Sequence, residues 1–145
     1  PMGLEPAGLG ARDTLRLEKG YPLYGHELDE TTTPLEAGLD WVVKLAKGSF
    51  MGRKALLQQK EQGISRKLVG LELLEPGIAR SGHVLFKNGK SVGRVTSGTK
   101  SPSLGKSIAL AYVASEETEQ NNSMQVEIRG RRIETRIVPL PFYRR

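Results

Sequence analysis

The sequence contains no cysteine and only two histidines among its 145 residues. Without cysteine the chain cannot form a disulfide, a thiolate zinc site or a cysteine nucleophile. His26 and His83 are the only imidazoles, which excludes a metal cluster built from several histidines and cysteines. The sequence therefore predicts no metal site.

Long hydrophobic runs are also missing. Apolar stretches such as residues 108–111 are far shorter than the roughly 20 residues that span a bilayer. The first 20 residues carry scattered acids and bases rather than a basic start followed by an apolar core, so they indicate no signal or transit peptide. We therefore expect no membrane association and no secretion. The expected location is the cytoplasm of a bacterium, or the mitochondrial matrix of a eukaryote.

The net charge of +6 is unevenly distributed. Residues 1–62 hold eight Lys and Arg against nine Asp and Glu, a balance of −1, whereas residues 63–145 hold fourteen against seven, a balance of +7. A basic half suits nucleic acid, an anionic small molecule or an acidic protein partner. Because the basic residues are scattered singly, a solvated strand face is their commoner meaning, and nucleic acid is the weaker alternative.

The first 62 residues alternate between helical and irregular patterns. Mixed apolar and charged positions followed by Gly20 predict a helix over residues 9–18. Glycine, proline and threonine are frequent in residues 20–38, which predicts a long irregular segment, and loops of this length are usually functional. Residues 41–45 predict a strand, and residues 52–62 an amphipathic helix that ends at Gly63.

The second half changes to the period of β-strands. The Asn88-Gly89 pair between two apolar segments favours a tight hairpin. Six short strands are predicted, over residues 67–73, 84–86, 91–96, 107–113, 124–128 and 132–138. The predicted fold class is therefore α+β: a short helical and irregular N-terminal segment followed by a small antiparallel barrel, or a sandwich, of about six strands.

His26 lies near Glu27, Asp29 and Glu30, a group that could act as a base or as a ligand set. A loop histidine beside solvated acids is the commoner reading of such a group. No nucleophile with its base, paired carboxylates or phosphate-binding loop stands out elsewhere.

Charge and aromatic rings are concentrated in residues 10–25. Arg12 and Arg16 are four residues apart on one helix face, where two guanidinium groups could grip a carboxylate. Tyr21 and Tyr24 could stack on a flat ring, so the group suits a planar, anionic ligand. The alternative is an ion pair of either arginine with Asp13 or Glu18, with tyrosines that only pack.

Several long stretches together resemble one family. They are GLGARDTLRLE at residues 8–18, YPLYG at 21–25, LDETTTPLEAGLDWVVKL at 28–45, FMGRKAL at 50–56, TSGTKSPSLGKSIALAYV at 96–113 and PFYRR at 141–145. In this order they are similar to the C-terminal part of the T-protein, or aminomethyltransferase, family of the glycine cleavage system. The resemblance covers nearly the whole chain.

The resemblance implies an activity and two partners. Members of this family take the aminomethyl group carried on the lipoyl arm of the H-protein, transfer its one-carbon unit to tetrahydrofolate and release ammonia. Three domains surround an opening that holds the folate, and the last domain is a small antiparallel barrel. We accordingly expect residues 1–62 to complete the folate-binding domain and residues 63–145 to form the barrel domain.

The resemblance also implies site residues. Arg12 and Tyr21 match two family contacts to folate, and a residue of the C-terminal tail, for which Tyr143 and Arg144 are the candidates, provides another. The N-terminal part that holds the family's catalytic aspartate has no counterpart here. We therefore expect no catalytic residue in this sequence, and expect it to be an inactive piece of a longer chain.

Two alternatives remain open beside this reading. One is a folate-binding accessory module of the same superfamily, of the iron–sulfur assembly or dimethylglycine oxidation type. The other is a basic barrel that binds nucleic acid, although the sequence lacks the grouped aromatic residues of single-strand binders. From the charge asymmetry we also expect the acidic H-protein, or the glutamate tail of folate, to meet some of the basic residues Lys87, Lys90, Arg94, Lys100 and Lys106.

Overall fold

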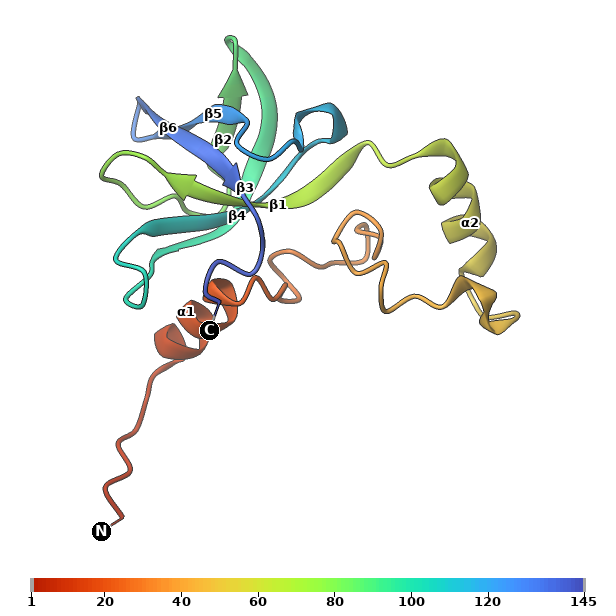
Figure 1. The fold of residues 1–145 in the computed structure, drawn as a ribbon, viewed down its shortest axis with the longest axis horizontal. Helices are drawn as coiled ribbons and strands as arrows, with labels where there is room; N and C mark the ends of the chain where they lie inside the picture. The colour runs from red at the N-terminus through yellow and green to blue at the C-terminus, as the bar shows by residue number, and fades with distance from the viewer. Residues whose placement is uncertain (1, 145) are drawn as a thin grey trace.

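The computed structural model describes residues 2–144 and consists of a helical N-terminal region followed by a β-barrel (Figure 1). Its elements are α1 (Leu9–Glu18), the 3₁₀ helix η1 (Leu45–Lys47), α2 (Arg53–Gln62), β1 (Arg66–Leu73), β2 (Val84–Lys87), β3 (Lys90–Lys100), β4 (Ser107–Ala114), the 3₁₀ helix η2 (Ser115–Glu117), β5 (Ser123–Ile128) and β6 (Arg131–Val138). The predicted helices and the predicted fold class are confirmed. None of these helices is long and apolar enough to cross a membrane.

The six strands form a closed barrel in the order β1-β4-β3-β2-β5-β6, and every neighbouring pair is antiparallel. The β2–β3 turn contains Asn88 and Gly89, both with positive φ angles, as the Asn-Gly pair predicts. Closure pairs the edge strands with each other, so the barrel leaves no free edge for a further strand.

Two hydrophobic cores lie on opposite faces of β4. Alternate residues of a strand point to opposite sides of the sheet. Ala109, Ala111 and Val113 therefore face the interior of the barrel, whereas Ile108, Leu110 and Tyr112 face outward into a second core. This explains why the β4 sequence is apolar at consecutive positions.

The outer core is covered by α1 and by the C-terminal tail. Leu17 of α1 is fully buried against the outward side chains of β4, and Leu140 and Phe142 of the tail pack beside it. The tail crosses β1 at Gly70, where an added Cβ would lie 2.8 Å from Leu140 Cδ2 and 3.0 Å from the ring of Phe142. Figure 1 shows the C-terminus next to α1, below the barrel. The N-terminal helix and the last residues are thus held together on the outside of the barrel.

The strand predicted at residues 41–45 is wrong. Val42 N–H donates to the carbonyl of Leu39 and Val43 N–H to that of Asp40, which are turn hydrogen bonds, and η1 begins at Leu45. The residues have the β propensity that suggested a strand, but a strand needs a partner. The closed barrel offers none.

The loop between β1 and β2 generates a prediction about packing. A Cβ added at Gly98 of β3 would lie 2.3 Å from the backbone oxygen of Ala79, so Gly98→Ala must displace the loop. Overpacking of this kind costs about 1–3 kcal/mol. We expect this loss in the free energy of unfolding, measured by urea denaturation followed by circular dichroism. Gly10→Ala is the matched control, because a Cβ there meets nothing within 4 Å. Equal stability of both variants would contradict the packing argument.

Candidate ligand-binding site

The C-terminus of α1 fixes the position of Tyr21. Gly20 has a φ of +67°, a conformation that glycine adopts without strain. It lets Gly20 N–H donate to the carbonyl of Leu17 and Tyr21 N–H to that of Arg16, at 2.8 and 2.9 Å. This is a Schellman motif, and it confirms the predicted glycine stop. The chain therefore turns sharply at Gly20 and places Tyr21 directly after the helix.

A buried carboxylate holds the following loop on the barrel. The side chain of Glu27 has no exposed surface. It accepts hydrogen bonds from Arg16 Nη1 at 2.6 Å, from Ser97 Oγ of β3 at 2.6 Å and from the Leu23 N–H at 3.0 Å. A buried charge is tolerated only when it is paired and hydrogen-bonded, as Glu27 is. The network therefore connects α1, the loop and the barrel.

Arg16 belongs to this network and not to a ligand-binding pair. Its side chain is 11% exposed, and it pairs with Asp13 as well as with Glu27. Its Nη1 also donates to the carbonyl of Tyr21 at 3.3 Å. The predicted grip of Arg12 and Arg16 on one carboxylate is therefore wrong, because the guanidinium group of Arg16 is already used inside the protein. The alternative of an Arg16–Asp13 ion pair is confirmed.

A second buried carboxylate secures the last turn of α1. Glu18 accepts hydrogen bonds from the hydroxyl groups of Ser101 and Ser103 in the β3–β4 loop. Burial by itself raises the pKa of Glu18, but these hydrogen bonds outweigh it and hold the pKa below its ordinary value of 4.5. The helix end is thus attached to a barrel loop by an ionised group.

The irregular segment contributes a third contact to the barrel. Glu36 accepts a hydrogen bond from Arg66 Nε at 3.0 Å and one from the Thr33 N–H at 2.8 Å. Tyr112 of β4 donates its hydroxyl to the carbonyl of Glu27 at 2.9 Å, and the guanidinium of Arg66 lies 4.7 Å from its ring centre. Burial raises the pKa of the Tyr112 phenol to about 12. The loop that the sequence predicts to be functional is therefore rigidly based.

Arg12 and Tyr21 both lie on the open surface. Arg12 is exposed on α1, and Tyr21 is 63% exposed. They are nine residues apart, about 13 Å along the helix direction, a distance that two long side chains can span together. Tyr24 is also exposed, two turns of irregular chain further on. The arrangement offers one guanidinium and two phenol rings to solvent, but it does not enclose a cavity.

The tail candidates lie at the other end of α1. Tyr143 N–H donates to the carbonyl of Glu18 at 2.9 Å, and Lys19 Nζ lies 5.1 Å from the centre of the Tyr143 ring. Arg144 is exposed and lines a small hollow of about 190 Å³ together with Phe142. Tyr21 and Tyr143 are therefore both attached to the last turn of the same helix.

The acidic group around His26 does not assemble. His26 is exposed, whereas Glu27 points into the barrel network and Asp29 accepts hydrogen bonds from Thr31 and Thr32. Within residues 2–144 no cluster of three or more His, Asp or Glu side chains is arranged to hold a metal ion.

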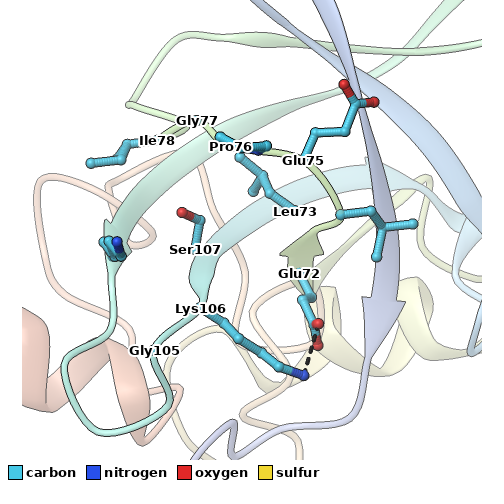
Figure 2. A pocket seen from close by; sticks show the side chains of 11 residues that line it. Glu72, Leu73, Glu75, Pro76, Gly77, Ile78, Gly105, Lys106 and Ser107 are labelled. Carbon is cyan, nitrogen blue, oxygen red and sulfur yellow. Dashed lines mark ion pairs between the residues drawn. The ribbon is translucent and has the colours of Figure 1, made fainter.

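The five basic residues of the second half are spread over the barrel. Lys90 and Lys100 begin and end β3, about 33 Å apart for a strand of this length. Lys87 pairs with Glu117, and Lys106 pairs with Glu72 at 2.9 Å. Figure 2 shows this second pair at the mouth of a hollow of about 500 Å³ between the end of β1 and the β3–β4 loop. The five residues therefore do not form one anionic-partner surface.

Glu27, Ser97 and Glu36 were not singled out by the sequence, although they organise the site. Arg16 and Ser97 are 81 residues apart, so no spacing rule brings them together. The only available signal was the number of acids in a segment that otherwise looks like a loop.

The lowered pKa of Glu18 predicts an acid-labile contact. A carboxyl whose pKa is lower in the folded than in the unfolded state stabilises the fold above its unfolded pKa, and this contribution is lost as the pH falls through the folded pKa. We expect Glu18→Gln to reduce stability at neutral pH and to flatten the fall in unfolding free energy from about pH 5 to about pH 3. Urea denaturation across this range measures both. Glu61→Gln, at an exposed position of α2, is the control and should keep the wild-type slope. An unchanged slope in Glu18→Gln would refute the assignment.

Two family sequence patterns match the chain. The glycine cleavage T-protein C-terminal barrel domain matches residues 66–144, and the GCVT N-terminal domain matches residues 1–47. The first match coincides with the six-stranded barrel.

Known proteins agree with these matches. The chain is 56% identical to the aminomethyltransferase of Thermosynechococcus vestitus and 54% identical to that of Bacillus subtilis, over 99% of its own length in each case. It spans 39% and 40% of the length of these two relatives. A crystal structure of the glycine cleavage system aminomethyltransferase T from Bartonella henselae has a TM-score of 0.91 at 39% identity, over 96% of this chain and 40% of that one. The resemblance inferred from the sequence is confirmed: the chain belongs to the glycine cleavage T-protein family and matches the C-terminal portion of its aminomethyltransferases.

Proposed function

We propose that the chain supplies the C-terminal share of an aminomethyltransferase of the glycine cleavage system. In this reaction the one-carbon unit of the aminomethyl group on the lipoylated H-protein passes to tetrahydrofolate, and ammonia is released. The observation that carries the proposal is the match of 99% of the chain to proteins named aminomethyltransferase. Residues 1–62 would complete the folate-binding domain, and residues 63–145 would form the barrel domain.

Tetrahydrofolate is the substrate that we propose for the surface formed by α1 and the loop after it. Arg12 makes no ion pair within residues 2–144, so its guanidinium is available to a carboxylate or to a polar ring edge. Tyr21 offers a flat apolar face with a hydroxyl at its tip. Either Tyr143 or Arg144 would add a contact from the tail. These groups bind and orient the substrate.

The buried network supports this role by fixing the two main contacts relative to each other. Arg12 stands one turn before Arg16 on α1, and Arg16 bonds to the carbonyl of Tyr21. Precise positioning of binding groups requires rigid supporting contacts. Arg16, Glu27 and Ser97 would provide that support.

The H-protein is the proposed protein partner. Lys90 and Lys100 are exposed and make no ion pair within the described residues, so either can face an acidic surface. Since they lie at opposite ends of β3, we propose that one end of the barrel, and not both, meets the H-protein.

The proposal predicts that the isolated chain does not turn over. The groups that orient the reacting amine would belong to the part of the relatives that this chain does not match. We expect no methylenetetrahydrofolate above background from aminomethylated H-protein, tetrahydrofolate and the pure 145-residue protein, with the Bacillus subtilis aminomethyltransferase as the active control. Robust formation that depends on the 145-residue protein would contradict this division of roles.

The proposal also predicts a contribution of Arg12 to folate affinity. A hydrogen bond to a charged group contributes about 1.5–3 kcal/mol, so Arg12→Ala should weaken tetrahydrofolate binding by about tenfold or more. Calorimetric titration of tetrahydrofolate into the chain measures this change. Arg131→Ala, at an exposed position of β6, is the control and should bind as the unmodified chain does. Equal affinities of all three proteins would remove Arg12 from the site.

A further inference from the structure

The segment from Asp40 to Gln62 stands apart from both cores, and we call it the arm. It contains η1 and α2, and Figure 1 shows α2 away from the barrel. No residue between Gly38 and Lys67 is buried. The arm therefore has the sequence of folded structure without a core of its own.

Large apolar side chains of the arm face solvent. Trp41 is 70% exposed, Met51 is fully exposed, and Val42 and Phe50 are exposed as well. Single exposed apolar residues are ordinary, but a group of them on one short segment marks an interaction surface.

The arm also contains a hollow that fits an apolar side chain. Its volume is about 430 Å³, and its floor is formed by Val42, Val43, Phe50 and Leu56. Lys44 and Lys47 stand at the same hollow. A partner that fills it should bring an apolar side chain flanked by acidic groups.

The exposed helix α2 needs such a partner. An isolated helix shorter than about 12 residues is marginal in water, and most helical stability in proteins comes from a packed face. α2 has ten residues and buries none of them. Contact with a partner would supply the missing packing.

A second copy of the chain is a poor occupant. The arm carries Lys44, Lys47, Arg53, Lys54 and Lys60 against Asp40 and Glu61, five positive charges against two negative, or +3. Two arms that meet face to face would repel each other.

The comparisons indicate a better occupant. The GCVT N-terminal domain pattern matches residues 1–47, which end inside the arm, and about three fifths of each relative lies outside the matched region. We propose that the arm is a docking surface for the unmatched part of the longer aminomethyltransferases. An apolar side chain of that part would occupy the hollow, and its acidic residues would face Lys44 and Lys47.

The experiment coexpresses this chain with the unmatched part of the Bacillus subtilis aminomethyltransferase and measures their affinity by sedimentation. We expect a one-to-one complex, which Phe50→Asp weakens at least tenfold because it places a charge in the hollow. Leu74→Asp is the matched control, since Leu74 is 50% exposed but lies on the barrel, and it should bind as the unmodified chain does. Hydrogen exchange should show new protection of amides in α2 on complex formation.

Three results would overturn the proposal. The first is failure of the coexpressed chains to copurify. The second is a complex that Phe50→Asp leaves intact or that Leu74→Asp weakens equally. The third is a dimer of this chain alone that Phe50→Asp dissociates, which would make a second copy the occupant. Because association is measured without folate, these outcomes are independent of the Arg12 titration.

Discussion

The ion pair between Arg16 and Glu27 determines where the N-terminal region lies on the barrel. Glu27 carries its charge with no exposed surface, which is possible only because Arg16, Ser97 and the Leu23 N–H all donate to it. Removing any one donor would leave a partly unsatisfied buried charge. The geometry of α1, the loop after it and β3 is therefore mutually dependent, and the surface that presents Arg12 and Tyr21 inherits its rigidity.

The double burial of β4 gives this arrangement its base. One face of the strand fills the barrel, and the other receives Leu17 from α1 and Phe142 from the tail. The N-terminal helix and the C-terminal residues thus meet on one strand although they are more than a hundred residues apart. This is why Tyr21 and Tyr143 are attached to the same helix end.

The two regions before the barrel differ in how they are stabilised. α1 and the loop up to Glu36 are held by three carboxylates that bond to the barrel or to its first strand. The arm has no comparable contact and exposes the side chains that would form a core. A surface for a small ligand and a surface for a polypeptide are thus adjacent in the sequence but physically distinct: one is polar and rigidly supported, and the other is apolar and uncovered.

The sequence by itself determined the elements whose cause is local. The Asn88-Gly89 turn, the glycine stop at Gly20 and the alternation of the strands follow from backbone conformation and side-chain period, so the helices and the barrel were predictable. Tertiary structure alone decided that residues 41–45 form turns, because the closed barrel leaves no strand for them to pair with. It also decided that Arg16 is structural and Arg12 free, since the carboxylate and hydroxyl that claim Arg16 come from residues 11 and 81 positions away, a distance at which spacing carries no information.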